Sequence, residues 1–389
     1  MANTQTLTGF TELIYEARDI VCREPVGFAS SVLVNSGSEG VSINGTVKSF
    51  VAGQPTLNTD HTPAMTVPAG DDMTSTVEEM TIGQVARINI PLKGETLRQL
   101  DNTAGRDNFV KNVLAQGIRA IVNAIESHIG TVAKNGASRA VGTAGTTPFA
   151  SVHSLIPQCN QILTDNGAPQ DGQRSLVLST GAATNLKTLS HIYKVNESGT
   201  AETLRGGVLL DIDGVAIKQS AGVAAHTKGA GASYVINNGN ITAGSTTISI
   251  DGGTVNTTGF KAGDIVTIAD EPTAGKYVIN TGLTATAGNI IIAKPGLRGA
   301  IVDGKAVTIG DSYTGNVLFH RSAIELAIRP PAMPDGGDIA EDRMTVVDPV
   351  SGLVFEVALY KGYGMNLMEI VCYYQAKVWK SEFVATLLG

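Results

Sequence analysis

Histidine and cysteine are the residue types in this chain most able to bind a metal or attack a substrate, and neither shows the spacing that such chemistry requires. The six histidines form no HExxH motif and no other metal-ligand pattern: His61, His128, His153, His191, His226 and His320. The three cysteines, Cys22, Cys159 and Cys372, lie far apart, which argues against a disulfide framework and a zinc site. We expect each cysteine to be a small buried apolar residue, and His128 to flank a helix at the surface.

Neighbouring carboxylates do not form an acid–base pair either. The pairs Asp71/Asp72 and Glu78/Glu79 would diverge if they lie on strands, because successive side chains of a strand point to opposite faces. Asp211 and Asp213 are explained by a turn at Asp213-Gly214. The best candidates for weak cation binding are Asp335, Asp338, Glu341 and Asp342. We expect these four to lie in a solvated loop instead, because the order of an EF-hand is missing.

Motifs for phosphate binding or nucleophilic catalysis are missing from the sequence. There is no G-x-x-x-x-G-K-[ST] segment and no G-x-S-x-G elbow, and we expect Gly275-Lys276 and Gly304-Lys305 in turns beside strands. The sequence therefore predicts no catalytic residue, no cofactor-binding residue and no metal site, and a protein that is not an enzyme.

The element with the clearest pattern is a helix over residues 107–135. Its apolar residues follow at steps of 4, 4, 3, 4, 4 and 3, the spacing of a helix with one buried face: Val110, Leu114, Ile118, Ile121, Ile125, Ile129 and Val132. The other face is expected to carry the polar residues Lys111, Asn112, Gln116, Arg119, Asn123, Glu126 and Lys134. At about 1.5 Å per residue this helix would be about 43 Å long.

The chain before this helix is extended and poor in core-forming residues. After a short helix over residues 8–24, strands are predicted around residues 41–51 and 85–90, separated by a loop over residues 52–72 with few aliphatic side chains. We interpret the two strands as a projecting arm. A two-stranded arm is marginal alone, so it should be stabilised on a neighbouring molecule.

The chain after the long helix changes character twice. Residues 151–225 predict a mixed α/β unit with a helix over 151–164, a buried strand over 175–178 and a helix over 182–189. From residue 226 to residue 312, short strands separated by Gly, Asp and Asn predict a small β-barrel or sandwich. Long strands over 353–359 and 368–378 then follow, so the β block is predicted to be inserted into another domain.

Composition and charge limit the functions that remain. Hydrophobic residues make up 42% of the 389 residues, which is typical of a globular protein, whereas aromatic residues make up 5%. The net charge of −7 and the absence of a Lys/Arg block give no global attraction to nucleic acid, so DNA contact would be local and non-specific. The first 20 residues lack a basic region followed by an apolar run, and no apolar stretch of about 18 residues occurs, so we expect no signal peptide, no membrane partner and a protein made in a reducing cytoplasm.

Read in order, these segments resemble the major capsid proteins of tailed bacteriophages, which share the Hong-Kong-ninety-seven fold. LTGFTELIYEARDIVCREPVGFASSVLVNS is similar to the N-terminal arm of the short-tailed-phage, P-twenty-two-like coat type, and MTIGQVARINIPLKGETLRQLD to the return strand of the extended loop. RDNFVKNVLAQGIRAIVNAIESHIGTVA is similar to the spine helix, and QILTDNGAPQDGQRSLVLSTGAATNL to the entry of the axial domain. FKAGDIVTIA and GNVLFHRSAIELAIRPP resemble the start of an inserted barrel and the return from it. The last segment, which resembles the closing strands of the peripheral domain, is SGLVFEVALYKGYGMNLMEIVCYYQAKVWKSEFVATLL.

The resemblance implies an α+β phage major capsid fold with an inserted small β-barrel domain. The implied segments are an N-terminal arm over 1–45, an extended β loop over 46–92, the spine helix and a first peripheral part over 93–145, an axial domain over 146–225, the inserted barrel over 226–314, and axial and peripheral return strands over 315–389.

The same resemblance implies a protein that assembles with itself into hexamers and pentamers of an icosahedral shell around double-stranded DNA. The implied partners are a scaffolding protein, a portal, a possible decoration protein, and packaged DNA bound by non-specific contact. The implied location is the virion, after assembly in the host bacterial cytoplasm. Some family members crosslink through a lysine of the extended loop and a peripheral asparagine. For Lys48, the lysine available for that role here, we expect a solvated or salt-bridging side chain.

Two alternatives from other classes remain at this point. A cellular encapsulin-like nanocompartment shell would share the fold but should lack the inserted barrel. A β-rich carbohydrate-binding protein would need clustered aromatic residues and a carboxylate pair in a groove, and the single Trp379 argues against it.

Overall fold

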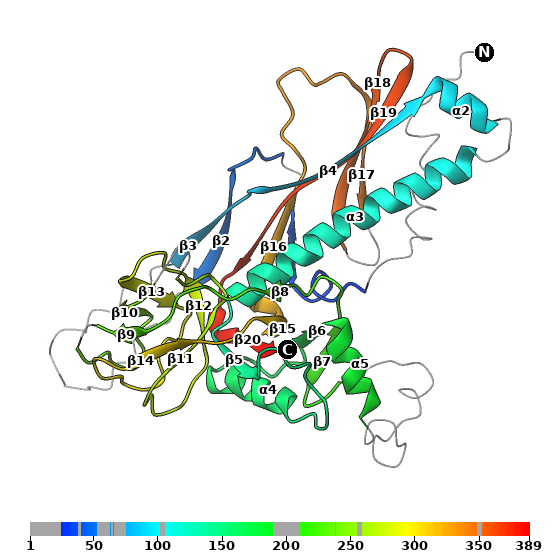
Figure 1. Ribbon diagram of the computed structural model, residues 1–389. Helices are drawn as coiled ribbons and strands as arrows, with labels where there is room; N and C mark the ends of the chain where they lie inside the picture. The colour runs from blue at the N-terminus through cyan, green and yellow to red at the C-terminus, as the bar shows by residue number, and fades with distance from the viewer. Residues whose placement is uncertain are drawn as a thin grey trace.

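The structure is a computed structural model of the chain (Figure 1), and it describes residues 25–37, 40–52, 63, 65, 75–101, 106–189, 211–237, 239–254, 259–347 and 352–389. The predicted helix over residues 8–24 and most of the predicted loop over residues 52–72 lie outside the described residues. So do Cys22, His61, Asp71, Asp72 and His191.

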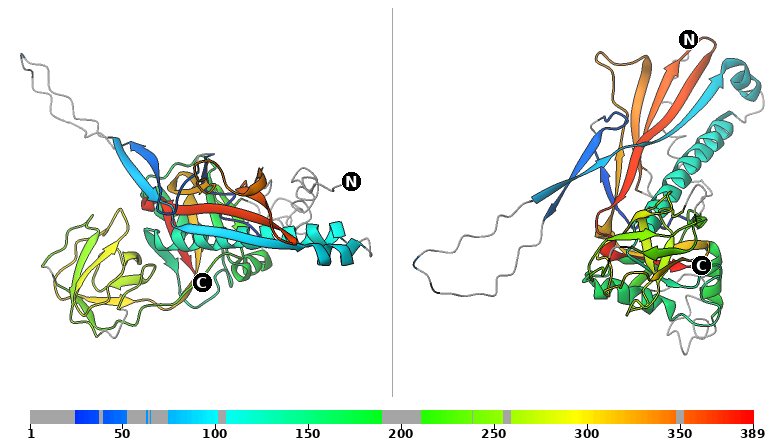
Figure 2. Two further views of the ribbon diagram at one scale, coloured as in Figure 1. Left: turned by 90° about the horizontal axis from the view of Figure 1, so that it is seen from above. Right: turned by 60° about the vertical axis from the view of Figure 1, so that its left-hand side comes forward.

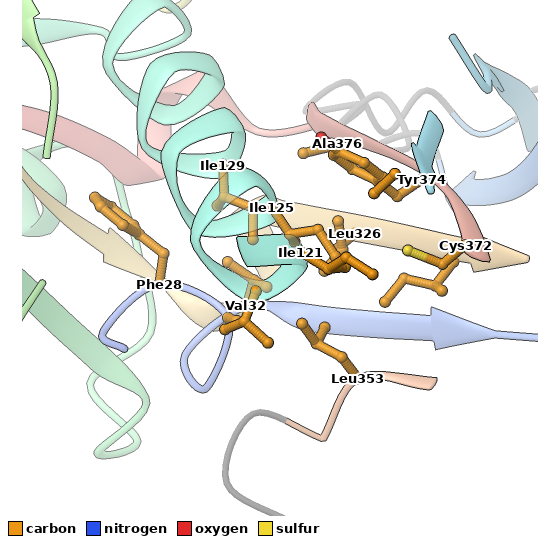
Figure 3. Packing of buried hydrophobic residues seen from close by; sticks show 14 of the residues in the cluster. Phe28, Val32, Ile121, Ile125, Ile129, Leu326, Leu353, Cys372, Tyr374 and Ala376 are labelled. Carbon is orange, nitrogen blue, oxygen red and sulfur yellow. The ribbon is translucent and has the colours of Figure 1, made fainter. Parts of the chain in front are cut away.

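The long helix is confirmed as α3 (Arg106–Asn135), which follows the shorter α2 (Gly94–Asp101). Its predicted apolar stripe is buried from Val110 to Ile129, and Val132 packs partly against the same core. Figure 3 shows Ile121, Ile125 and Ile129 facing Phe28 on one side and Leu326 and Tyr374 on the other. The periodicity of the sequence therefore identified the core-facing side of this helix correctly.

A six-stranded sheet lies along α3. It is built around the 14-residue strand β19, and its strands are β1 (Leu33–Ser36), β16 (Ile324–Arg329), β19 (Met365–Val378), β18 (Val354–Lys361), β17 (Ala340–Val347) and β4 (Gln84–Lys93). Strand β4 pairs with β19 from Lys93 to Gln84, while β18 and β16 share the other edge of β19, one after the other. In Figure 1, α3 runs beside β4 and β19 along the length of this sheet.

The base of the molecule is a second, 12-stranded sheet that has two parts. Its first part contains β5 (Arg139–Gly142), β20 (Val384–Leu388), β15 (Tyr313–His320), β6 (Arg174–Leu178), β7 (Val215–Gln219) and β8 (Ala225–His226). The helices α4 (Leu155–Asp165) and α5 (Thr180–Thr188) pack on it through a core of their own. Asp213 and Gly214 have φ angles of 57° and 70°, which confirms the predicted turn before β7.

The second part of this sheet is a closed β-barrel. Its strands are β9 (Tyr234–Ile236), β10 (Thr247–Asp251), β11 (Ile265–Ile268), β12 (Tyr277–Thr281), β13 (Gly288–Ile292) and β14 (Ala306–Ile309), and pairing of β11 with β12 closes the ring. The barrel has a separate core that includes Tyr234, Phe260 and Tyr277. The chain enters through β8 and leaves through β15, which pair with each other at His226 and Tyr313. The barrel is therefore an insertion, as predicted.

A two-stranded ribbon forms the remaining described element. Strands β2 (Thr46–Ala52) and β3 (Ser75–Thr81) pair antiparallel, with Ala52 opposite Ser75 at the far end. The right-hand view of Figure 2 shows this ribbon pointing away from both sheets. Among the described helices, none is long and apolar enough to cross a membrane.

Candidate functional site

Glu126 is a buried acidic side chain that fastens the start of the described chain to α3. Its Oε1 accepts hydrogen bonds from the backbone N–H groups of Gly27 and Phe28, at 2.6 and 2.7 Å. The same oxygen accepts from the Ser220 hydroxyl at 2.7 Å, and Oε2 accepts from the Ala29 N–H at 2.9 Å. Successive backbone N–H groups create a concavity that suits an anion, and hydrogen bonds to an ionised group are the stronger kind. We call these five residues the Glu126 anchor.

The segments of the Glu126 anchor are packed too closely for larger residues. A Cβ atom on Gly222 would lie 2.7 Å from Cγ of Glu126, and one on Gly27 would lie 2.9 Å from a methyl group of Val177. Backbone approach of this kind requires glycine. The sequence placed Glu126 on the polar face of the helix, and that prediction is wrong: only 2% of the residue is exposed, because residues 27–29 and 220–222 cover it.

Lys134 was also predicted on the polar face and is also buried. Its ammonium group lies 3.3 Å from Nδ1 of His226, and Nε2 of His226 lies 2.8 Å from Oδ1 of Asp264. Asp264 accepts two further contacts from the backbone, from the N–H groups of Gly229 and Lys261. A neutral imidazole that accepts at Nδ1 and donates from Nε2 satisfies this arrangement. Lys134, His226 and Asp264 form the ionic cluster.

The ionic cluster joins α3 to the entrance of the barrel, because His226 belongs to β8 and Asp264 precedes β11. Burial lowers the pKa of Lys134, and the negative charge of Asp264 opposes that shift. Burial also raises the pKa of Tyr313, whose ring lies 5.1 Å from the His226 ring and whose hydroxyl donates to the Gly263 carbonyl. The three side chains are buried, so the cluster positions the barrel and offers no access to a substrate.

His128 is not the surface residue that the sequence suggested. Its ring stands edge-on to Tyr374 with 5.5 Å between centroids, and its Nε2 is buried without a hydrogen-bond partner. Burial lowers the pKa of His128. The residue therefore lies between α3 and the six-stranded sheet rather than at the surface.

The ribbon of β2 and β3 is held at its base by a small apolar cluster. Val47, Met80 and Ile82 are buried against Ala327 of β16, with Tyr373 and Trp379 beside them. Beside this base, Lys48 and Glu79 form an exposed ion pair of 3.5 Å. The salt-bridging interpretation of Lys48 is confirmed.

Four of the acidic residues considered for catalysis or cation binding, Glu78, Glu79, Asp338 and Glu341, are paired with cations of the chain. Glu78 pairs with Lys377 and Glu79 with Lys48, so the two carboxylates diverge as predicted. Arg343 forms ion pairs with both Asp338 and Glu356, and Lys361 pairs with Glu341. Within the described part of the chain, no group of three His, Cys, Asp or Glu residues is placed to hold a metal ion.

The two described cysteines are buried, and burial raises the pKa of each thiol to about 12. Such thiols are not nucleophilic at neutral pH. The predicted interpretation of Cys159 and Cys372 as buried apolar residues is confirmed.

His320 forms hydrogen bonds with Asp171 through Nε2 at 3.0 Å and with Ser322 through Nδ1 at 2.8 Å, beside a surface turn. Asp213 accepts a hydrogen bond from the Asn160 amide in the turn before β7.

No protein-family model matches this chain, and no curated protein matches it. Among solved structures it is similar to the capsid of the cyanophage P-SCSP1u, with a TM-score of 0.50 and 10% identity over 94% of this chain and 88% of that chain. It is also similar to a structure from Mycobacterium phage Che8, with a TM-score of 0.44 and 15% identity over 88% and 84% of the two chains. A virus-like particle from Pyrococcus furiosus aligns with a TM-score of 0.41 and 7% identity over 98% of both chains. The cyanophage similarity shows that the chain has the phage major capsid fold, and the predicted fold class is confirmed.

Proposed function

We propose that this chain is the major capsid protein of a tailed phage and that its copies assemble into an icosahedral shell around double-stranded DNA. The observation that carries the proposal is the projecting ribbon of β2 and β3 on a subunit with the phage capsid fold. Among the described strands, β2 and β3 pair only with each other, so each has one edge without a partner strand. Unpaired strand edges favour pairing with another chain.

The energetics of the ribbon support a role in contacts between subunits. An isolated two-stranded hairpin is marginally stable in water. Here, the described core of the ribbon is confined to its base. Apolar side chains are also exposed at one end of the six-stranded sheet, where Ile339 precedes β17 at 79% exposure and Tyr363 lies in the turn between β18 and β19 at 106%. The ribbon and this end of the sheet would both gain by burial against neighbouring subunits.

The proposed partners follow from this role. Copies of the chain would form hexamers and pentamers, with scaffolding protein and portal guiding closure and with a decoration protein as a possible addition. Packaged DNA would be held by local, non-specific contact. The shell would assemble in the host cytoplasm and remain in the virion. We propose a structural role without enzymatic activity. Two observations on the described residues support it: both thiols are buried, and carboxylates such as Asp338 and Glu341 form ion pairs with Arg343 and Lys361. The inserted barrel favours this proposal over an encapsulin-like shell.

Negative-stain electron microscopy of the purified chain, expressed alone and with its neighbouring genes, tests the proposal. We expect closed shells, aberrant spirals or isolated capsomers. A monomer under every condition would remove the capsid interpretation.

A ribbon variant tests the observation that carries the proposal. Because Ala52 lies opposite Ser75, residues 53–74 can be replaced by Asn-Gly, a dipeptide that closes antiparallel strands as a two-residue turn. The variant should fold with unchanged circular dichroism and should not form stable shells. A matched control is Lys48→Gln, which removes only an exposed ion pair and should assemble normally. Normal shells from this variant would show that residues 53–74 are not needed for assembly and would leave only β2 and β3 themselves as the connecting element.

A further inference from the structure

An open cavity of about 250 Å³ lies at the seam between the inserted barrel and the rest of the base. One wall is β5, from Arg139 to Gly142, and the opposite wall is the turn from Ala274 to Lys276 that leads into β12. The α4 side chains Gln158 and Ile162 complete the lining. The two walls are joined directly, since the Ala140 N–H donates to the Lys276 carbonyl at 2.9 Å.

Two cations line this cavity, and neither forms an ion pair with a carboxylate among the described residues. The Arg139 guanidinium donates through Nη2 to the Asn166 side chain at 3.0 Å, while its Nε is buried without a partner. The Lys276 ammonium donates to the Gly142 carbonyl, a neutral acceptor. A buried N–H group without an acceptor is costly, which makes Arg139 the incomplete part of the seam.

The surrounding charges leave this site positive. Burial and the like charge of Arg298 lower the pKa of Arg139, while Asp165 and Glu271 act in the opposite direction. Asp165 is the partner of Arg298, at 3.8 Å. The Glu271 carboxylate already accepts from Thr273, Gly275 and Tyr277. Neither acid therefore neutralises the two cations that face the cavity.

We propose that this cavity is a binding site for a phosphate oxyanion, held by Arg139 and Lys276 across the seam. A phosphoryl group offers several acceptor oxygens, and arginine recognises such groups through its planar fork of donors while lysine acts as a point charge. The oxyanion would add a charged acceptor beside the Arg139 guanidinium and the Lys276 ammonium, and it would connect β5 to the barrel. The source is either free inorganic phosphate or a phosphate of a nucleic-acid backbone, and the site does not depend on shell formation.

Thermal unfolding of the full chain in potassium phosphate, against potassium chloride at equal ionic strength, tests the site. We expect a saturable stabilisation by phosphate alone. Arg139→Gln and Lys276→Gln should each weaken it about tenfold, the equivalent of one charged hydrogen bond. Arg139→Lys retains the charge and should retain part of the binding. The control is Lys294→Gln, which removes an exposed lysine of the same barrel that does not line the cavity.

A labelled 12-base-pair duplex distinguishes the two sources. Duplex binding that weakens in Arg139→Gln and Lys276→Gln, and that phosphate competes away, would support the site and assign it to nucleic acid. Phosphate binding without duplex binding would support it as a site for the free anion. If phosphate and chloride act equally at matched ionic strength, and duplex binding is the same in all variants, the proposal is overturned. Circular dichroism of Lys276→Gln separates loss of the site from loss of the fold.

Discussion

Replacing Glu126 by glutamine tests whether the Glu126 anchor fixes the chain segment that precedes β1. The amide oxygen of glutamine can occupy the Oε1 position, which accepts from Gly27, Phe28 and Ser220. The amide nitrogen must then face the N–H group of Ala29, where the native Oε2 accepts a hydrogen bond. One charge-assisted hydrogen bond is lost and three become neutral.

The expected loss of stability follows from these contacts. A hydrogen bond to a charged group contributes about 1.5–3 kcal/mol, and the desolvation of a buried charge, which glutamine avoids, offsets part of the total. We expect Glu126→Gln to destabilise the anchor by about 2–4 kcal/mol. Glu126→Leu leaves buried backbone N–H groups without an acceptor at about 1–3 kcal/mol each, and we expect about 4–6 kcal/mol.

Hydrogen exchange at the amides of residues 27–29 measures this local effect, because a chain with several cores is not expected to unfold in one step. At about 1.4 kcal/mol for each factor of ten, Glu126→Gln should accelerate their exchange about 30- to 700-fold. Ser220→Ala removes one donor and should have a smaller effect. Glu79→Gln, at an exposed position, is the control and should change nothing. Exchange at the native rate in both Glu126 variants would refute the anchor.

Three further predictions concern α3. Ile121→Asp places a charge at a side chain that is 2% exposed, and it should yield insoluble subunit because the cost is several kcal/mol; solubility after expression measures this, and a soluble, shell-forming variant would contradict it. Because burial lowers the pKa of His128, the unfolded chain binds more protons than the folded chain, and the free energy of unfolding should fall as the pH drops below about 6.5. In denaturant titrations over that pH range, His128→Phe should lose less of its free energy of unfolding than the native chain. Equal losses in the two proteins would exclude His128 as a contributor. Asp264→Ala removes the carboxylate of the ionic cluster, leaves Lys134 buried without a nearby negative charge, and should lower the free energy of unfolding by about 3–5 kcal/mol. Adding Lys134→Met to this variant should restore part of the lost free energy. Strict additivity of the two changes in this double-mutant cycle would mean that the charges are not coupled.

Local sequence patterns predicted most of the elements because those elements are governed by periodicity and turn chemistry. The stripe from Val110 to Ile129 repeats at helical spacing over 20 of the 30 residues of α3, so its buried side was readable without tertiary information. Five of the six barrel strands were found in the same way, since each is a short apolar run between Gly, Asp and Asn residues, whereas β9 was not predicted. The positive φ angle of Gly214 is another local property that an Asp-Gly pair announces.

The buried polar residues could not be found by the same reasoning. Glu126 is covered by residues 27–29 and by Ser220, which lie more than ninety positions away in sequence. Lys134 contacts His226, and His226 contacts Asp264, only because the barrel is inserted where it is. Charged residues are rarely buried, so a polar residue off the apolar stripe is expected at the surface unless its partners are known. The one weak signal was glycine at Gly27 and Gly222, where the backbone approaches too closely for a side chain.

The two halves of α3 have different surroundings, and this difference explains why its polar residues were misplaced. From Val122 to Asn135, only Ala124 and Ser127 are exposed. At about 100° per residue, Glu126, His128 and Lys134 point in three separate directions. These directions lead to the segment before β1, to the six-stranded sheet and to the inserted barrel. The second half of the helix is therefore enclosed on several sides and fixes three parts of the subunit relative to one another. In the proposed role, a shell subunit that contacts its neighbours through a projecting ribbon would need such a fixed centre, because any rotation there would be amplified at the end of the ribbon.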